Sequence, residues 1–341
     1  MGLRIFIIMG LFGSFFNSSK GQATNKENKI YPQAIISRTR VLEGRYVNSI
    51  INNGGSYFLI DLPIFEDGIV DCWETVDLEL LKTKISTGWL SPSVPNKERI
   101  SKHHLAGWEI ESSKWFYTKG NYYDFILSIV KSLNPSLTNL FHSNGQTSKV
   151  IGNTTYSTFT YSSEHLLRKD HEKNISFKEV KGKREHYLFK KSEGVYWLCN
   201  FNIYVDSSIL IDGIGSSLYF NNKKELEQFI NNGTIATMIP DNSIILIQDL
   251  GEIKISKTLY NADITEKFSE IDDIISGLNG KPTTSDECVK IYEEYNKNPT
   301  KENKQKLKTA YEKIPKHLRV YVLGDMDVKD WPIRNIIYEK K

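Results

Sequence analysis

The sequence predicts an α+β fold of two tandem homologous domains, each a mostly antiparallel sheet with two helices, followed by a C-terminal helical hairpin. The first observation is an internal repeat, the pattern to seek before any other. Residue pairs recur at a spacing of 139: Gly55/Gly194, Tyr57/Tyr196, Leu59/Leu198, Ile64/Ile203 and Asp67/Asp206. Others recur at a spacing of 145: Gly88/Gly233, Pro95/Pro240, Leu105/Leu250, Ile126/Ile271, Leu133/Leu278 and Asn134/Asn279. One six-residue insertion between residues 206 and 226 reconciles the two spacings, so we predict that one domain occurs twice.

The second observation is the hydrophobic period within each copy. Apolar side chains alternate over residues 58–64 and 197–203, which indicates a strand with one face on a core. The turn sequence at residues 66–68 and the run that follows it predict a hairpin. Residues 77–88 then predict a helix, with Asp77 as its N-cap and Gly88 at the left-handed position after its end. Residues 222–233 are the matching helix of copy two.

The remaining elements of each copy follow in the same order. Residues 93–110 and 238–255 each contain a proline-led turn and two short strands. A closing helix follows at residues 122–133 and at residues 267–278, and Asn134-Pro135 or Asn279-Gly280 ends it. Strand pair, helix, strand pair and helix is an order typical of α+β folds, with the helices on one side of the sheet.

These elements divide the chain into six predicted segments. Residues 1–23 are a signal peptide, 24–39 a linker, 40–140 copy one, and 141–175 a linker or surface arm with a hairpin at residues 150–161. Residues 176–282 are copy two, and residues 283–341 are the helical hairpin and tail. The hairpin breaks at Asn298-Pro299, and Thr300 caps its second helix.

The N-terminal residues are typical of a secretory signal. Arg4 precedes an uncharged, mostly apolar run at residues 5–16, and Gly21 and Ala23 are the small residues that a signal peptidase reads. The apolar run is too short to span a bilayer comfortably. We therefore expect a periplasmic or extracellular protein with no stable membrane anchor after cleavage. The alternative is a strand or helix docked on the domain of a cytoplasmic protein.

Composition excludes some classes of function and leaves others open. The formal net charge is +3, from 44 basic and 41 acidic residues, which argues against nucleic acid as a partner. Cys72, Cys199 and Cys288 are odd in number and lack metal-ligand spacing, so we expect buried, inert thiols. No nucleophile elbow, phosphate-binding glycine loop, zinc spacing or dinucleotide fingerprint occurs, and no cofactor is predicted. The glycine-containing run at residues 212–217 lies in the insertion and predicts a longer hairpin loop.

Candidate site residues come from comparing the two copies, because polar residues present in one copy only are freer to serve function. Copy one supplies the weak catalytic candidates, a histidine and carboxylate set capable of acid-base chemistry: His103, His104, Asp61, Asp71 and Glu74. It also supplies the ligand-binding candidates, with aromatic walls and polar groups: Glu66, Asp67, Trp73, Trp89 and Trp108. Since adjacent strand residues point to opposite faces, we expect only one of the two histidines to face a given cleft.

A second constellation lies near the C-terminus. Asp325, Asp327 and Asp330 could chelate a hard cation, although the full calcium-loop pattern is absent. The simpler expectation is a tail with Trp331 and Ile333 packed on the body and the aspartates capping a helix or pairing with Arg319. We therefore predict no metal and keep the three aspartates as weak candidates.

Three runs of sequence carry a resemblance to a known family: "YFLIDLPIFEDGIVDCWETVDLELL", "RISKHHLAGWEI" and "IPKHLRVYVLGDMDVKDWPIR". They resemble a bacterial family of uncharacterised function, and the GDMDxKDxPIR-like ending is the most distinctive. The resemblance covers most of the chain after residue 40. It implies a bacterial source and the same duplicated α+β domain, and it brings no activity, cofactor or catalytic residue.

The sequence therefore predicts an exported bacterial binding or interaction protein, with a protein partner or a small ligand. One alternative is a hydrolase-like enzyme that uses His103 or His104 with an acid from residues 61–74. A second alternative is an immunity-type protein that neutralises a toxin by surface contact. A histidine within hydrogen-bond reach of Asp61, Asp71 or Glu74 in a concave pocket would favour the enzyme.

Overall fold

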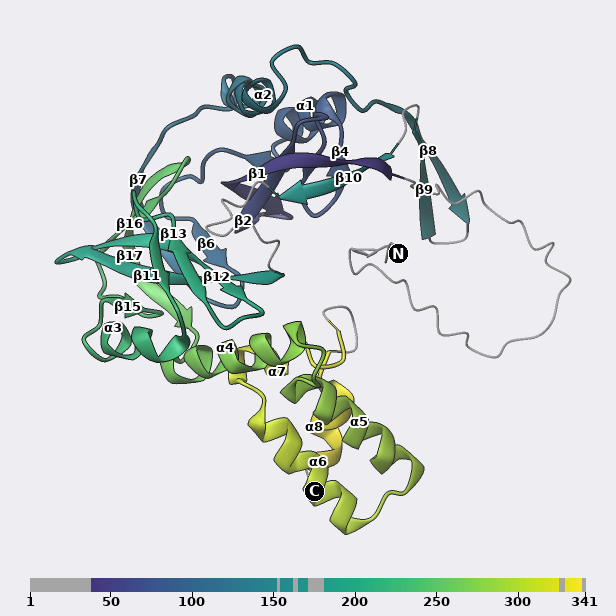
Figure 1. Cartoon of the computed structure of the whole chain (residues 1–341), viewed down its shortest axis with the longest axis vertical. Helices are drawn as coiled ribbons and strands as arrows, with labels where there is room; N and C mark the ends of the chain where they lie inside the picture. The colour runs from purple at the N-terminus through teal and green to yellow at the C-terminus, as the bar shows by residue number, and fades with distance from the viewer. Residues whose placement is uncertain (1–37, 152–153, 162–164, 171–180, 325–328, 339–341) are drawn as a thin grey trace, which may run out of the picture. The chain divides into compact units, whose positions relative to one another are not determined.

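The computed structural model describes residues 38–151, 154–161, 165–170, 181–324 and 329–338 (Figure 1). The expected signal peptide, most of the expected first linker, and the candidates Asp325 and Asp327 lie outside the described residues. Within the described part, no helix is both long enough and apolar enough to cross a membrane.

One large, mostly antiparallel sheet contains strands from both copies. Its main order is β10-β1-β2-β6-β7-β17-β16-β12-β11-β15, in which β10 (His165–Asp170) comes from the segment between the copies. Copy one contributes β1 (Arg38–Asn53), β2 (Ser56–Phe65), β6 (Arg99–Lys102) and β7 (Ala106–Trp115). Copy two contributes β11 (Gly182–Ser192), β12 (Val195–Tyr204), β15 (Ile235–Ala236), β16 (Ile244–Ile247) and β17 (Gly251–Asn261). Short strands β3 (Val70–Asp71), β4 (Thr75–Val76), β5 (Leu90–Ser91), β13 (Ile209–Asp212) and β14 (Leu218–Phe220) branch from this order.

The pairing confirms the duplication. β7 and β17 form the central antiparallel pair, and the equivalent strands then follow outward in the same order on both sides: β6/β16, β2/β12 and β1/β11. β2 pairs in parallel with β6, and β12 pairs in parallel with β16. The central pair depends on Gly251, whose φ is 146°. A Cβ there would lie 2.3 Å from the carbonyl oxygen of Lys114, so a side chain would force the two copies apart.

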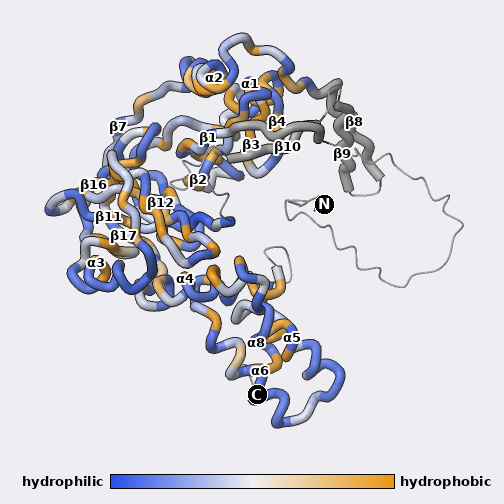
Figure 2. The backbone as a smooth tube through the Cα atoms, in the orientation of Figure 1, coloured by the Kyte–Doolittle hydropathy of each residue, from blue (hydrophilic) through white to orange (hydrophobic). Residues whose placement is uncertain are grey.

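The two copies share a hydrophobic core in addition to having one each. Ile50 and Leu59 of copy one belong to the same buried cluster as Leu188 and Leu198 of copy two, together with the fully buried Trp108. On the other face of the sheet, a second cluster lies under α1 (Leu78–Thr87) and α2 (Tyr122–Leu133). A third lies under α3 (Glu227–Asn231) and α4 (Ile264–Leu278). Figure 2 shows hydrophobic residues along these strands and helices. The copies are thus halves of one sheet, joined more closely than the tandem repeat by itself predicted.

The predicted helix signals hold in copy one. The Asp77 side chain accepts hydrogen bonds from the backbone N–H groups of Glu79 and Leu80, and Gly88 has a φ of 81°. Copy two replaces this helix with a 3-10 turn, η1 (Lys223–Leu226), and the shorter α3, neither of which has a side-chain cap bond.

The insertion in copy two lies at the β13–β14 hairpin. Asp71 pairs with Thr75 in copy one, whereas the equivalent Leu210 pairs with Tyr219 across a longer loop. The spacing between equivalent residues grows from 139 at Leu210 to 144 at Tyr219, so five of the six extra residues lie at 213–217. The glycine-containing run is therefore a hairpin loop, as expected.

The segment between the copies forms an antiparallel hairpin of β8 (Ser143–Ile151) and β9 (Thr154–Tyr161), and then β10 (His165–Asp170), which pairs in parallel with β1.

The C-terminal segment contains α5 (Thr284–Lys297), α6 (Lys301–Lys313), α7 (Lys316–Arg319) and α8 (Trp331–Ile337), which bury a cluster of their own. Thr283 and Thr300 cap α5 and α6, which confirms the predicted helical hairpin.

The tail matches its expected packing in part. Ile333 is fully buried, but Trp331 is 65% exposed, so the expectation that both pack on the body was wrong for the tryptophan. Trp331 is the first residue of α8, where its side chain lies outside the buried stripe of Ile333 and Ile337. Asp330 is buried and accepts a hydrogen bond from the hydroxyl of Tyr311. Arg319 donates instead to the backbone carbonyls of Ile314 and Glu312.

Candidate functional site

A polar cavity of about 860 Å³ lies between the two copies. Its walls come from β1, β2 and the end of α2 in copy one, and from β11, β12, β13, the 213–217 loop and the β16–β17 turn in copy two. Because the lining side chains belong to both halves of the sheet, neither copy alone could form this site.

A hydrogen-bonded network around Asp212 lies on the wall of the cavity. One carboxylate oxygen accepts a hydrogen bond from the Asn200 Nδ2 amide at 2.7 Å, and the other accepts one from the Asn202 Nδ2 amide at 2.8 Å. Arg184 Nε donates to the Asn202 Oδ1 oxygen at 2.9 Å. The Arg184 guanidinium lies 3.8 Å from the centre of the Tyr46 ring of copy one. The network thus holds a carboxylate and a guanidinium in fixed positions on the cavity wall.

A second set of contacts surrounds Asp61. The Lys102 ammonium donates to Asp61 Oδ1 at 2.9 Å, and His186 Nε2 lies 3.0 Å from the same oxygen. Burial raises the pKa of Asp61, but the neighbouring His186 and Lys102 lower it well below its usual value. Burial also lowers the pKa of His186, so its ring is neutral at neutral pH and donates from Nε2. Lys102 is therefore the positive partner that keeps Asp61 ionised.

The polar network is specific to copy two. Arg184 pairs with Asn202 in copy two as Tyr46 pairs with Pro63 in copy one. Tyr46 and Pro63 are therefore the copy-one equivalents of Arg184 and Asn202. At the same spacing of 139, Asp212 corresponds to Trp73. Copy one therefore has a tryptophan, a proline and a tyrosine at the positions where copy two has the hydrogen-bonded aspartate, asparagine and arginine.

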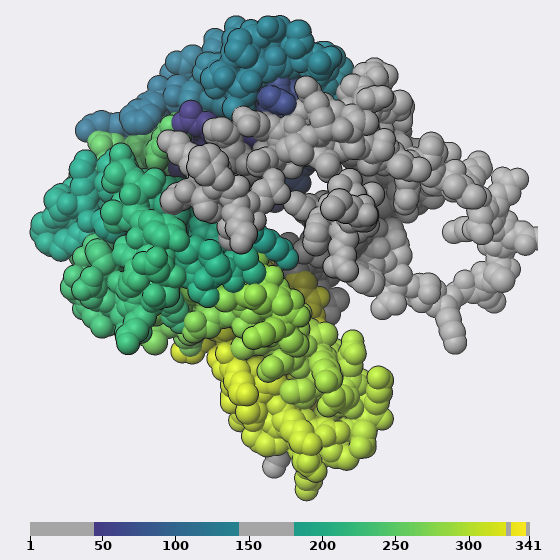
Figure 3. Space-filling model, viewed as in Figure 1, coloured from purple at the N-terminus to yellow at the C-terminus, as the bar shows by residue number. Residues whose placement is uncertain are grey.

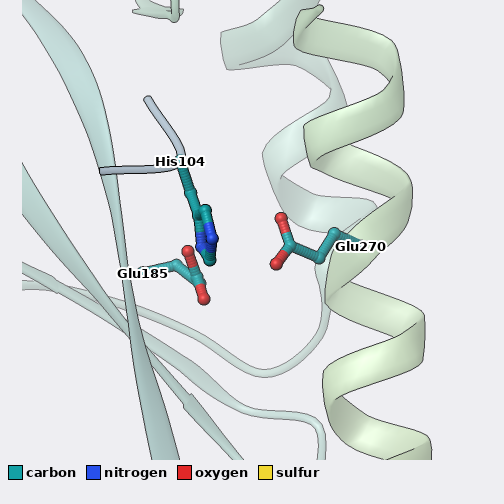
Figure 4. Close-up of side chains that lie close together, drawn as sticks. All are labelled: His104, Glu185 and Glu270. Carbon is teal, nitrogen blue, oxygen red and sulfur yellow. The ribbon is translucent and has the colours of Figure 1, made fainter. Parts of the chain in front are cut away.

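A buried ionic cluster lies on the other face of β11, under α4. His104 comes from the β6–β7 turn, Glu185 from β11 and Glu270 from α4, and Figure 4 shows the three side chains pointing toward one another. Their ligand atoms lie within 4.8 Å of one another, which is a geometry compatible with a metal ion. Nε2 of His104 is buried and has no hydrogen-bond partner among the described residues.

Lys267 already supplies the cation of this cluster. It is fully buried, and its Nζ lies 3.0 Å from Glu185 Oε2 and 3.6 Å from Glu270 Oε2. A divalent ion between these carboxylates would face the ammonium at short range, and buried like charges repel strongly. Burial lowers the pKa of His104 to about 3, so this ring is neutral. The cluster is therefore a buried ion-pair group rather than a site prepared for a metal.

The C-terminal segment bonds to α4 of copy two at this cluster. Figure 3 shows the surface of the C-terminal helices adjoining that of copy two. His317 Nε2 lies 2.9 Å from Glu270 Oε2, and the backbone N–H of Lys316 donates to the Glu266 side chain at 2.6 Å. The ring of His104 lies 6.1 Å from that of His317. The cluster thus joins copy one, copy two and the C-terminal helices.

Three residues of the hydrolase-like alternative have other partners in the structure. His104 lies beside Glu185 and Glu270, Asp61 is bonded to Lys102 and His186, and the Glu74 carboxylate is bonded to Lys84. The expectation that His103 and His104 point to opposite faces was wrong, since their rings lie only 3.9 Å apart. Both residues belong to a turn, where His104 has a φ of 59°, so strand alternation does not apply.

The other candidates occupy varied places in copy one. Asp71 is half-buried in β3, and Glu66 is half-buried in the turn after β2. Asp67 is buried and its side chain accepts a hydrogen bond from the backbone N–H of Ile69.

The three candidate tryptophans differ in exposure. Trp73 is 50% exposed with a φ of 62°, and its ring lies 5.4 Å from that of Phe58. Trp89 is covered by the Lys84 ammonium at 4.3 Å, and Trp108 is in the shared core. Of all ten copy-one candidates, only Asp61 lines the cavity.

Most residues of both sites were missed from the sequence, although one signal was present. Lys267 and Glu270 fall on the apolar stripe of α4 together with Ile271 and Ile274, and α2 has Tyr122 and Phe125 at the equivalent positions. Charged residues on the buried stripe of a helix require partners, so this difference between the copies could have pointed to the cluster. The Asp212 network had no comparable signal, because it depends on pairing across β12 and β13.

The comparisons with known proteins identify the family without a function. The profile described as "Domain of unknown function (DUF7638)" matches residues 32–137 and 170–282, which are the two copies together. The profile described as "Domain of unknown function (DUF7639)" matches residues 283–341, the helical segment. No curated protein and no solved structure matches the chain. With the greater part of its length matched in two segments that the structure joins in one sheet, the chain belongs to the DUF7638 domain family.

Proposed function

We propose that this chain is a binding protein that holds a small polar ligand in the cavity between its two copies. The observation that carries the proposal is the Asp212 carboxylate, held by Asn200 and Asn202 and linked through Asn202 to Arg184. Such prearranged polar groups in a cavity of about 860 Å³ fit the size and chemistry of a small-molecule site. Copy two supplies the network, and copy one supplies the opposite wall.

The test uses Asp212→Asn, which changes one oxygen to an amino group of nearly the same size. In the variant, one of the two asparagine amides faces a donor instead of an acceptor. Loss of a hydrogen bond to a charged group costs about 1.5–3 kcal/mol, so we expect ligand affinity to fall roughly 10-fold to 100-fold. The measurement is a thermal-shift screen of a small-metabolite library, followed by titration calorimetry of each hit.

The matched control is Asp272→Asn on α4, where the carboxylate is 69% exposed and pairs with Lys223. It should bind each hit as the unmodified protein does. Hits that bind the unmodified protein and Asp212→Asn equally well would place the ligand elsewhere and contradict the proposal. A library without a single hit would contradict it as well.

Export is proposed on the N-terminal pattern of Arg4, the apolar run and Ala23. We expect the protein purified from its native organism to begin at Thr24, as read by N-terminal sequencing. Substituting Ala23 with arginine should block cleavage and leave the longer chain, because signal peptidase requires a small residue at this position. A mature protein that retains Met1 or Gly2 would refute export.

A further inference from the structure

We infer that the ligand of the inter-copy cavity is a neutral, hydroxyl-rich molecule of the sugar or polyol class, an inference that rests on the proposed binding function. Three features of the cavity lead to this class: its charge balance, the kinds of groups that line it, and its size.

The charges of the cavity balance. Three carboxylates line it, Asp61, Asp212 and Asp249. Arg45 and Arg184 also line it, and the buried Lys102 donates a hydrogen bond to Asp61, so among the described residues three cations match the three acids. An anionic ligand would meet the carboxylates and a cationic ligand the guanidinium groups, so either would lose favourable solvation without a net electrostatic gain. A neutral ligand avoids this cost.

The groups that line the cavity can both donate hydrogen bonds to hydroxyls and accept hydrogen bonds from them. A hydroxyl donates one hydrogen bond and accepts others. Carboxylates only accept and a guanidinium only donates, so a carboxylate and a guanidinium near one another satisfy both needs of a hydroxyl. Asp212 and Arg184 are held in such an arrangement through Asn202, and the serines of the 213–217 loop add groups that do both. Hydrogen bonds to charged groups are the stronger kind, which offsets the dehydration of several hydroxyls.

The aromatic surface does not favour a flat aromatic ligand. Tyr46 lines the cavity, but the Arg184 guanidinium already lies over its ring. Tyr204, the other aromatic residue of the lining, is 8% exposed. A nucleobase or an indole would therefore have to displace Arg184 in order to stack on the face of Tyr46 that this side chain covers.

The size suits one or a few sugar rings. A water molecule occupies about 30 Å³ in the liquid, so a cavity of about 860 Å³ has the volume of nearly thirty waters. That is more than a single small ion or a metabolite of a few atoms requires. It lies in the range of about 300–1,000 Å³ that is usual for small-molecule sites.

The test is a binding panel with the full-length protein, read by saturation-transfer NMR and calorimetry. The neutral arm contains glucose, galactose, mannose, N-acetylglucosamine, maltose and myo-inositol. The charged arm contains glucuronate, glucosamine, glutamate, lysine and the zwitterion alanine. Each is measured on the unmodified protein, on Asp212→Asn, and on the surface control Asp272→Asn. We expect at least one neutral compound to bind, with affinity reduced roughly 10-fold or more in Asp212→Asn and unchanged in the control.

The outcomes separate this inference from the proposed function. If only charged or zwitterionic compounds bind, and Asp212→Asn removes that binding, the cavity is a ligand site and the sugar class is wrong. If neutral sugars bind equally to the protein and to Asp212→Asn, the ligand class stands without the cavity, and the inference is overturned. If nothing in either arm binds, the inference fails, and the metabolite screen decides whether the cavity binds another class.

Discussion

Replacing Lys267 with methionine is expected to lower the free energy of unfolding by about 3–5 kcal/mol, because it removes the buried cation that two buried carboxylates share. Lys267 is fully buried between Glu185 and Glu270, which are 7% and 3% exposed. Methionine keeps most of the unbranched side chain, so the packing against the Tyr187 ring changes little. The measurement is equilibrium unfolding in urea at neutral pH.

The cause of this loss is the electrostatic repulsion between the two buried glutamates. Burial by itself raises the pKa of Glu185. The ammonium groups of Lys267 and Lys183 together have a larger effect in the opposite direction, and the pKa falls to about 2. Without Lys267, the two carboxylates repel each other at short range, and one of them takes up a proton on folding. Since the unfolded chain does not hold that proton at neutral pH, the stability that the variant loses relative to the unmodified protein should become smaller as the pH is lowered toward the ordinary range of a glutamate.

Two further variants distinguish the ionic explanation from lost packing. Lys223→Met removes an ammonium from the α4 surface pair with Asp272 and should cost at most about 1 kcal/mol. The triple change of Lys267→Met, Glu185→Gln and Glu270→Gln removes the whole charged set and should recover part of the lost stability. If Lys267→Met were as stable as the unmodified protein, the buried cluster would not hold this part of the fold together.

The elements of this fold could be predicted because each has a local signal. The alternation over residues 58–64, the Asp77 cap and Gly88 specify their strand and helix without reference to the rest of the chain. The duplication was equally visible, since the spacing of equivalent residues is a property of the sequence. These signals were sufficient for the α+β class and for the C-terminal hairpin.

The sites could not be predicted because they depend on contacts between the copies. His104 and Glu185 meet only because the two halves of the sheet share a core, and no local period encodes that meeting. The acids and tryptophans predicted for catalysis or ligand binding all belong to copy one, whereas the cavity uses Asp61 of that copy together with Arg184 and Asp212 of the other.

The buried state of His104 leads to a second large effect, a loss of stability in mild acid. Burial, together with the neighbouring His103, lowers the pKa of His104 from 6.5 to about 3, so the folded protein keeps this ring neutral where the unfolded chain protonates it. Between those pH values the unfolded state binds more protons, and the free energy of unfolding must fall as the pH falls. The linkage relation gives a loss of roughly 2 kcal/mol from this residue by pH 5.

The groups that face His104 set the sign of this effect. Glu185 would favour a charged ring, whereas Lys267, His103 and His317 oppose it, and burial is the largest contribution. His186 also has a pKa lowered by burial, so the unmodified protein should lose stability from both residues. The share of His104 is obtained by comparing two chains over the same pH range.

The matched variant for this comparison is His104→Asn. Asparagine tolerates the left-handed backbone that His104 adopts at a φ of 59°, and it does not titrate. Urea unfolding of both proteins from neutral pH to pH 5 should show the variant losing about 2 kcal/mol less than the unmodified protein over that interval. Parallel pH profiles would mean that protonated His104 is accommodated in the folded state, which the buried position between Glu185, Lys267 and the β6–β7 turn does not allow.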